Sequence, residues 1–252
     1  MSVQRTELQS YLSELLRVDQ IKDYCPNGLQ VEGKPVIAKI VTGVTASQKL
    51  IDHAIAKKAD AILVHHGYFW KSESVPIVGM KRRRIHALLH HDINLFAYHL
   101  PLDVHPELGN NARLAQLLGL KVTASLADLC PNAIGLVTEF EQPKSGDEVL
   151  RWLTDILSFP VVHVAQPNAI KTLALCTGAA QGFIDEVANL EVDAYMSGEI
   201  SEPTVHSAAE QGIHYFAAGH HATERYGIKA LGEHLAGKFD LDVEFVDLPI
   251  PA

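Results

Sequence analysis

The sequence predicts an α/β protein made of two similar halves, and three observations support this prediction. Short apolar segments with strand character alternate with amphipathic segments of helical spacing, as in folds that pack helices against sheets. Matching motifs recur in the same order in the second half. The 252 residues, of which 47% are hydrophobic and 20% charged, suffice for one large domain or two smaller ones.

The first helix is expected after Thr6, which would form a capping box with Gln9, and its leucines recur at helical spacing. A turn-rich loop follows at residues 23–28, where Asn27-Gly28 supplies a positive φ. We expect strands at residues 37–44, 61–65, 93–98, 134–139, 161–164, 172–177, 194–197, 213–217 and 243–246. We expect helices at residues 47–57, 81–91, 109–118, 147–158, 182–190, 203–211 and 222–235.

The repeat indicates a duplicated unit. Both copies end on metal-type side chains at the same spacing, His99-x-x-x-Asp103 and His220-x-x-x-Glu224. We place the junction near residues 125–133, with one domain at 1–128 and the other at 129–252. The matched pairs are Thr42-Gly43 with Thr177-Gly178, Leu50-Ile51-Asp52 with Phe183-Ile184-Asp185, Ala59-Asp60-Ala61 with Val192-Asp193-Ala194, and Ile85-His86-Ala87 with Val205-His206-Ser207.

Composition restricts the class of protein. A net charge of −9 argues against general nucleic-acid binding, although a small anionic substrate is compatible with it because a metal ion supplies local positive charge. The three scattered cysteines lack C-x-x-C spacing, which is typical of reduced thiols in the cytoplasm. Neither a signal peptide nor an apolar stretch of membrane-spanning length is visible, so we expect a cytoplasmic protein without membrane association.

His65 and His66 close an apolar run and are followed by Gly67. Neighbouring strand residues point to opposite faces, so both reach one metal ion only if the chain bends, which Gly67 permits. Alternatively, each histidine serves a different ion of a close pair. The competing interpretation is one hydrogen-bonded core histidine and one exposed histidine. The other clusters and the strand's carboxyl end, where open α/β sheets bind ligands, favour metal ligation.

His220 and Glu224 lie four residues apart near an expected helix start, so their side chains share one face. An imidazole and a carboxylate then meet at one point, and the carboxylate can bridge two ions. The alternative is a surface contact with an acid that is favoured by the helix dipole. The matching spacing of His99 and Asp103 favours metal binding.

Pro101 lies between His99 and Asp103 and rules out a regular helix there, so we expect a loop after a buried strand to arrange the two side chains. We favour Asp103 as a metal ligand. His99 is either a ligand or a neighbour bonded to a ligating group. His105 and His221 are expected to be neighbours rather than ligands.

The basic run from Lys81 to Arg84 is either a solvated helix face or a rim that attracts substrate phosphates. No other catalytic signature competes with the histidine clusters, since the chain has neither a Gly-x-Ser-x-Gly motif nor a P-loop.

Four segments carry a family resemblance: Asn27-Gly28-Leu29-Gln30-Val31-Glu32-Gly33, Val64-His65-His66-Gly67-Tyr68-Phe69-Trp70-Lys71, His99-Leu100-Pro101-Leu102-Asp103 and Gly219-His220-His221-Ala222-Thr223-Glu224-Arg225. With them the chain resembles the Nif-three-like family, also labelled GTP cyclohydrolase I type 2 homologues. The segments span nearly the whole chain in family order. No insertion separates the halves, so the chain resembles the short bacterial form.

The resemblance implies two interlinked α/β domains of similar topology, with helices packed on mixed sheets, in a ring-shaped homohexamer. It also implies two divalent metal ions per subunit, facing inward. The implied ligands are His65, His66, Asp103, His220 and Glu224, with Glu224 as the bridge. Zinc, iron and manganese all suit such ligands.

Our leading functional hypothesis is a metal-dependent hydrolase of the GTP cyclohydrolase kind, acting on a purine nucleotide or a related heterocycle. His99 or His221 would shuttle protons. The rival hypothesis is a protein that stores, senses or delivers metal, or a scaffold for a protein partner. Turnover of a nucleotide by the metal-loaded protein discriminates between them.

Overall fold

The computed structural model describes residues 1–130 and 133–251. The chain packs as two compact units. The first comprises Met1–Gly109 and Gly227–Leu248, and the second comprises Asn110–Tyr226 with the C-terminal residues from Pro249. These limits differ from the expected domain limits at 1–128 and 129–252. The expected junction at residues 125–133 lies inside the second unit, and residues 131 and 132 fall outside the described part of the chain.

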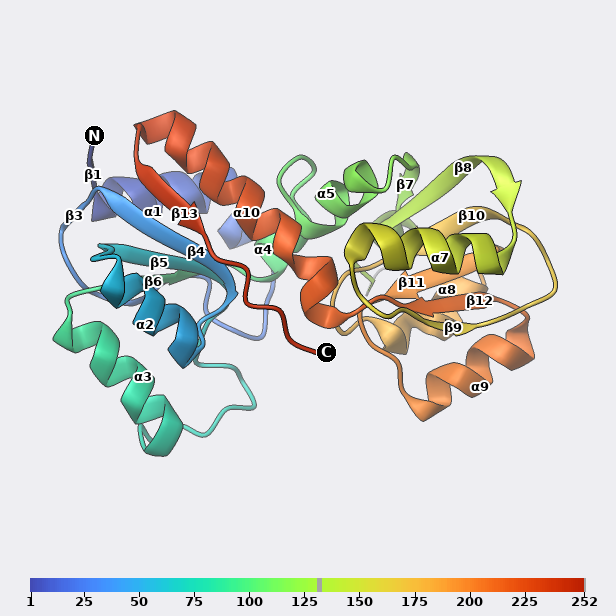
Figure 1. Ribbon diagram of the computed structural model, residues 1–252, viewed down its shortest axis with the longest axis horizontal. Helices are drawn as coiled ribbons and strands as arrows, with labels where there is room; N and C mark the ends of the chain where they lie inside the picture. Colours follow the sequence, from blue (N-terminus) through green and yellow to red (C-terminus); the bar gives the residue numbers. More distant parts are fainter. Residues whose placement is uncertain (131–132, 252) are drawn as a thin grey trace. The chain divides into compact units, whose positions relative to one another are not determined.

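The first unit is built on a mixed sheet with the strand order β13-β4-β5-β6-β2, of which Figure 1 labels all strands except β2. The first four strands of this order run parallel to their neighbours, and β2 pairs antiparallel with β6. The sequence analysis missed β2, which follows the turn-rich loop. The strands are β2 (Gly28–Val31), β4 (Lys39–Thr45), β5 (Ala61–His66), β6 (Asn94–Ala97) and β13 (Asp242–Phe245), beside a short pair of β1 (Val3–Gln4) and β3 (Val36–Ile37).

Helices cover both faces of this sheet because its parallel strands are apolar on both sides (Figure 1). In β5, Ala61 and Leu63 pack on the face that carries α1 (Arg5–Leu15), and Ile62 and Val64 pack on the opposite face. That opposite face carries α2 (Gln48–Ala56) and α3 (Gly79–His90). The long helix α10 (His220–Phe239) begins in the second unit, and its residues from Gly227 onward belong to the first.

The second unit contains a mixed sheet with the strand order β7-β8-β10-β11-β12-β9. Strands β10, β11 and β12 run parallel, whereas β7, β8 and β9 pair antiparallel with their neighbours. The strands are β7 (Lys121–Ser125), β8 (Leu136–Lys144), β9 (Val162–Val164), β10 (Ile170–Leu175), β11 (Ala194–Ser197) and β12 (His214–Ala217).

The helices of the second unit again lie on both faces of the sheet. α5 (Asn110–Leu117) and α7 (Gly146–Leu157) pack on one face. The short helix α6 (Leu126–Leu129), α8 (Ile184–Ala188), preceded by a 3-10 turn, and α9 (Glu202–Gln211) pack on the other. Helix and strand assignments therefore confirm the predicted α/β class.

The two units repeat one succession of elements. In the first, α1 precedes the edge strand β2, and then β4, β5 and β6 are joined by α2 and α3. In the second, α7 precedes the edge strand β9, and then β10, β11 and β12 are joined by α8 and α9. The edge strand is antiparallel to the last strand in both cases. This correspondence supports the predicted duplication.

One repeated residue shows why the sequence motifs recur. Asp60, before β5, accepts a hydrogen bond of 3.0 Å from the backbone N–H of Lys39 at the start of β4. Asp193, before β11, accepts a hydrogen bond of 2.8 Å from the backbone N–H of Thr172 in β10. In each unit, this hydrogen bond links the start of one parallel strand to the residue just before the neighbouring parallel strand.

The start of the first helix differs from the prediction. α1 begins at Arg5 with Gln4 as its N-cap, and no side chain caps it, so the predicted capping box of Thr6 and Gln9 was wrong. The backbone N–H of Arg5 instead donates to the carbonyl of Pro35 at 2.8 Å, which satisfies one of the unpaired groups of a helix start. A capping box is present in α7, where Ser145 bonds to Glu148.

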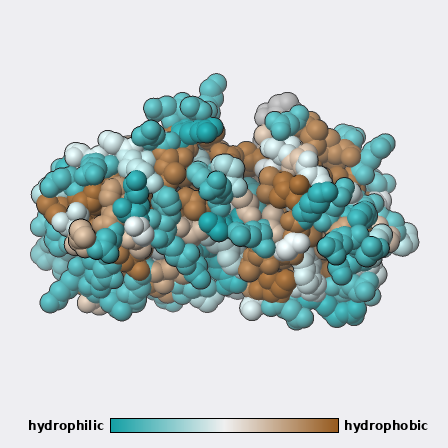
Figure 2. Space-filling view, turned by 90° about the horizontal axis from the view of Figure 1, so that it is seen from above, coloured by the Kyte–Doolittle hydropathy of each residue, from teal (hydrophilic) through white to brown (hydrophobic). Residues whose placement is uncertain are grey.

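Apolar side chains lie mainly in the cores of the two units. Hydrophilic residues predominate on the face drawn in Figure 2, with smaller hydrophobic areas between them. Within the described residues, no helix combines the length and apolar character that crossing a membrane requires.

Candidate metal centre

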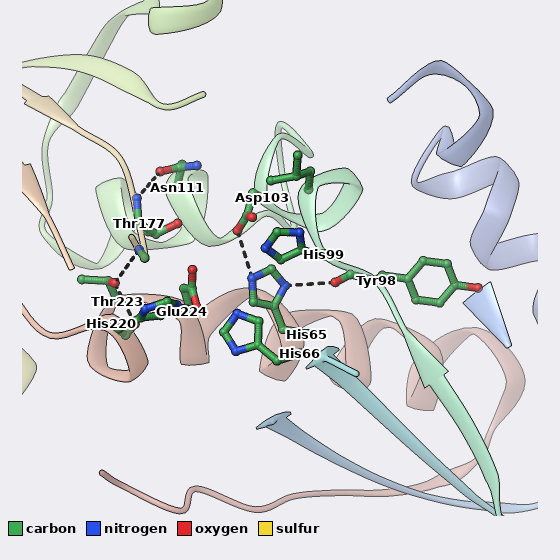
Figure 3. A network of polar contacts seen from close by, with 12 residues as sticks. His65, His66, Tyr98, His99, Asp103, Asn111, Thr177, His220, Thr223 and Glu224 are labelled. Atoms are coloured by element: carbon green, nitrogen blue, oxygen red, sulfur yellow. Dashed lines mark hydrogen bonds and ion pairs between the residues drawn. The ribbon is translucent and has the colours of Figure 1, made fainter. Parts of the chain in front are cut away.

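His65 is a fully buried side chain near the carboxyl end of β5, with an exposed fraction of 0%. Its Nδ1 lies 3.0 Å from the backbone carbonyl oxygen of Tyr98, which can only accept, so Nδ1 carries the hydrogen. Its Nε2 lies 3.5 Å from Oδ1 of Asp103 (Figure 3). In the neutral imidazole, Nε2 therefore carries the lone pair that a metal ion requires.

His66 follows directly in β5 and is only half-buried. Its Nδ1 lies 3.2 Å from Oγ1 of Thr45 on the neighbouring strand β4. The imidazole rings of His65 and His66 are 4.6 Å apart between centroids and inclined by 41°. The two adjacent side chains therefore lie side by side at the strand end, although strand neighbours normally diverge.

His99 and Asp103 flank a single helical turn, α4 (Leu100–Asp103), so the prediction that Pro101 excludes a helix between them was wrong. Proline is tolerated in a first helical turn because the N–H that it lacks has no partner within the helix there. His99 precedes the helix as its N-cap, and Asp103 closes it, with the Asp103 N–H donating to the His99 carbonyl at 3.1 Å. The turn therefore directs both side chains to the carboxyl end of β6.

The loop before β2 holds His99 in place. Oδ1 and Oδ2 of Asp23 lie 3.0 and 3.2 Å from Nδ1 of His99, and the backbone N–H of Leu100 donates to Asp23 at 2.9 Å. The Asn27 amide donates to Asp23 at 2.9 Å, while its oxygen accepts the backbone N–H of His99 at 2.7 Å. Burial disfavours the charged form of Asp23, but the bonds from His99, Asn27 and Leu100 outweigh it and hold the pKa of Asp23 well below its usual range.

The first unit therefore gathers a group of three imidazoles. His65, His66 and His99 each offer one nitrogen, and these nitrogens all lie within 4.8 Å of one another. Tyr24 and Trp70 pack edge-on against His99, with ring centroids 5.1 and 4.9 Å away. Imidazole groups and an adjacent carboxylate are a donor set that zinc, iron or manganese accepts, so the side chains fit a divalent metal.

In the second unit, His220 and Glu224 meet on the first turns of α10, as predicted. Nε2 of His220 lies 3.0 Å from Oε2 of Glu224, and its Nδ1 lies 2.7 Å from Oε1 of Glu199. Burial lowers the pKa of His220, but Glu224 and Glu199 outweigh that effect and raise it to about 9. Two carboxylates around one imidazole form an anionic group that suits a cation.

Backbone contacts fix this group within the second unit. The N–H of Gly178 donates to Oγ1 of Thr223 at 3.1 Å, and the N–H of Thr177 donates to Oδ1 of Asn111 at 2.9 Å (Figure 3). Gly178 has a φ of +70°, and Gly219, just before α10, has a φ of +88°. Positive φ explains glycine at both positions.

Two further histidines differ from these groups. Nδ1 of His105 accepts the backbone N–H groups of Glu107 and Leu108 at 3.2 and 3.0 Å, so it stabilises a turn. His221 is buried in the first turn of α10.

The basic run lies in α3. Within it, Lys81 pairs with Glu73 at 3.3 Å and lies 5.1 Å from the ring centroid of Phe69. Whether the run contacts a substrate stays a prediction.

The sequence analysis missed Asp23 and Glu199, the two carboxylates that bond to histidine Nδ1 atoms. Asp23 lies in a turn-rich loop 76 residues from His99, and no local spacing links them. A signal existed for Glu199, which follows β11 just as the histidine pair ends β5 in the repeated order of elements.

The sequence matches the Duf34/NIF3 (NGG1p interacting factor 3) family over residues 3–250. It is 55% identical over 253 residues to a Pasteurella multocida protein described as "GTP cyclohydrolase 1 type 2 homolog", covering 98% of both chains. It is 54% identical over 248 residues to the Vibrio cholerae protein of the same description, covering 97% of this chain and 98% of that one.

A similar fold occurs in a solved structure described as protein ybgI of unknown function. The TM-score is 0.94 at 52% identity, and the match covers 99% of this chain and 100% of that one. These matches extend over nearly the full length and include both histidine groups. The chain belongs to the Duf34/NIF3 family.

Proposed function

We propose that the protein is a metal-dependent hydrolase that acts on a purine nucleotide or a related heterocycle. One observation carries this proposal. In each unit an imidazole lies beside a carboxylate, and an oxygen acceptor holds the Nδ1 atom of that imidazole. This arrangement leaves the Nε2 side of each ring for a cation. The description of close relatives as GTP cyclohydrolase homologues agrees with the proposed reaction class.

We propose a dinuclear centre with the ligands that the family resemblance implies. These ligands are His65, His66, Asp103, His220 and Glu224. Glu224 is the proposed bridging carboxylate. Five imidazole and carboxylate ligands shared by two ions would leave coordination positions for water and substrate.

The side chains have distinct roles in this proposal. A bound divalent ion would lower the pKa of water towards ~7 and polarise the heterocycle. A protonated His220 must first release the hydrogen on Nε2, which faces Glu224 at 3.0 Å, because an imidazole binds a metal ion through the lone pair of this nitrogen. Asp103 and Glu224 offset the charge of the ions. His221 is a candidate for moving a proton to the leaving group.

The family resemblance also leads us to propose self-association as a ring-shaped homohexamer in the cytoplasm. Light scattering coupled to size-exclusion chromatography measures this assembly directly. A mass of about one chain at every concentration would contradict it.

Turnover by metal-loaded protein tests the enzymatic proposal. The metal-free protein is loaded separately with zinc, iron or manganese and incubated with GTP and other purine nucleotides, with ring opening followed by absorbance and product mass. We expect turnover that Glu224→Gln abolishes while assembly persists. Glu233→Gln is the matched control, because Glu233 is an exposed acid on the same helix.

Absence of turnover with all three metals would contradict the hydrolase proposal. Rapid metal exchange in a protein without turnover would instead favour metal storage or delivery.

A further inference from the structure

Three histidines of the two metal groups share one hydrogen-bonding pattern. In each, Nδ1 lies against an oxygen that accepts: the Tyr98 carbonyl for His65 at 3.0 Å, the Asp23 carboxylate for His99 at 3.0 Å, and the Glu199 carboxylate for His220 at 2.7 Å. In a neutral imidazole, an oxygen acceptor on Nδ1 holds the hydrogen there, so the lone pair lies on Nε2. Two of these histidines, His65 and His220, are ligands in the proposed centre. His99 has the same pattern but no assigned ligand role.

His105, six residues after His99, shows the opposite pattern. Its Nδ1 accepts two backbone N–H groups, so the hydrogen of its neutral ring lies on Nε2. Such a ring offers no lone pair to a cation. The orientation of His99 is therefore not a general property of histidines in this segment.

Asp23 accepts bonds from several directions, which fixes its position. The Tyr24 N–H donates to Oδ1 at 2.7 Å, and the Leu100 N–H and the Asn27 amide donate to Oδ2, each at 2.9 Å. The side chain of Asp23 is 3% exposed and that of His99 is 7% exposed. A buried carboxylate with this many donors acts as a fixed acceptor for Nδ1 of His99.

The rest of the His99 ring faces the histidine pair. Its centroid lies 5.0 Å from that of His65 and 5.8 Å from that of His66. One nitrogen of its ring lies within 4.8 Å of a nitrogen of His65 and of a nitrogen of His66. Nδ1 is occupied by Asp23, so Nε2 is the atom available to an ion shared with His65 and His66. Figure 3 shows the His99 ring beside that of His65.

We propose that His99 is a further metal ligand, acting through Nε2, and that Asp23 is the residue that positions it. The first unit then contains a tris-imidazole site of His65, His66 and His99 that binds one divalent cation without ligands from the second unit. This inference rests on the proposed metal centre and adds a sixth residue to its ligands. Asp23 acts through His99 and touches neither metal nor substrate.

The site is tested in a full-length variant that carries His220→Ala and Glu224→Ala, which removes the second unit's ligands. One equivalent of zinc is added, and X-ray absorption at the zinc edge counts the bound imidazoles. We expect three imidazoles, and two after His99→Gln is introduced. Three His ligands with an open fourth position are a common zinc arrangement.

Zinc affinity, measured by competition with a chromophoric chelator, gives a second readout. Asp23→Asn should weaken zinc binding by about 10–100-fold, the usual effect of losing an outer partner of a ligand. His99→Gln should weaken it at least as much. The matched controls are Asp19→Asn, an exposed acid in the preceding turn, and His91→Gln, an exposed histidine after α3. Neither control should change the affinity.

The outcomes separate this inference from the proposed function. Two imidazoles before and after His99→Gln, with unchanged affinity, would overturn the inference while leaving a metal centre in place. Failure of the wild-type chain to bind any divalent metal would overturn both. Circular dichroism checks that each variant folds, and if Asp23→Asn does not fold, the imidazole count with His99→Gln still decides.

Discussion

Gly178 lies directly against the carboxylate of Glu224, so closely that a Cβ at Gly178 would overlap Oε1 of Glu224. The backbone of Gly178 also has a φ of +70°, and its N–H donates to Thr223 in the first turn of α10. The sequence repeat already pairs Gly178 with Gly43, which Leu50 approaches in the first unit. In the second unit, this glycine makes space for a metal-type carboxylate.

Gly178→Ala should therefore displace Glu224 and weaken metal binding in the second unit. The substitution also incurs the left-handed backbone cost of about 1–2 kcal/mol. Gly212→Ala is a matched control, because Gly212 has nearly the same φ of +69° but nothing within 4 Å of an added Cβ. Both variants should lose similar stability in chemical denaturation, whereas only Gly178→Ala should lose metal. Equal metal content in the two variants would contradict the proposed role of Glu224.

Metal content per chain tests the number of ions. Elemental analysis of the wild-type protein should give about two divalent ions per chain, as in two-metal hydrolytic sites. His65→Ala and Glu224→Ala should each reduce this to about one or none, because His65 is fully buried beside Asp103 and Glu224 is the proposed bridge. His86→Ala, at an exposed position of α3, should leave the content unchanged. A wild-type protein without metal after loading would contradict the centre.

Asp60 should make stability depend on pH. Burial disfavours its charge, but the bonds from Lys34, Ala38 and Lys39 outweigh this and lower its pKa. A lowered folded-state pKa stabilises the fold above the unfolded pKa of about 3.9, and this contribution is lost as pH falls through the folded value. Asp60→Asn should cost about 1–3 kcal/mol at pH 7, as expected for bonds to a charged acceptor.

The measurement is urea unfolding of wild type and Asp60→Asn at pH 7 and at several values below 4. The difference in unfolding free energy should shrink as the pH falls below about 4, because Asp60 is protonated first in the unfolded wild type and only at lower pH in the folded one. Asp155→Asn, on the exposed side of α7, is the control and should show no such trend. A difference that stays constant down to the lowest pH would refute the prediction.

Much of the fold followed from the sequence because the spacing of apolar residues is a local signal. Helix α2 lies within the expected helix at residues 47–57, and the four residues of β11 coincide with the expected strand. The strand β2 was missed because Gly28 and the polar residues around it have turn character, and β2 forms by pairing with the distant β6. Non-local pairing has no signature within a short window of sequence.

The residues of the candidate site also differ in whether a local sequence signal predicts them. His65, His66, His220 and Glu224 were identified because adjacent or i, i+4 spacing places metal-type side chains together. Asp23 was not, since its bond to His99 connects residues 76 positions apart. The helical turn after His99 is also absent from the sequence-based prediction, because proline disrupts helix interiors, whereas Pro101 occupies the first turn, where it is tolerated.

The two tryptophans of the chain allow metal binding in the first unit to be observed separately. The ring centroid of Trp70 lies 5.9 Å from that of His66 and 4.9 Å from that of His99, whereas Trp152 packs against Phe140 in the second unit. A paramagnetic ion such as cobalt bound beside Trp70 should quench its fluorescence. Trp152→Phe should therefore retain most of the quenching, and Trp70→Phe should lose most of it.

Titration of both variants with cobalt, followed by fluorescence, provides the measurement, and calcium serves as the control because it prefers oxygen ligands to imidazole. Equal quenching in the two variants would show that cobalt binds elsewhere. The double variant Trp152→Phe with His66→Ala locates the ion. Loss of the Trp70 quenching in this variant would place cobalt at the histidines, because His66 is one of the proposed ligands whose rings lie beside that of Trp70.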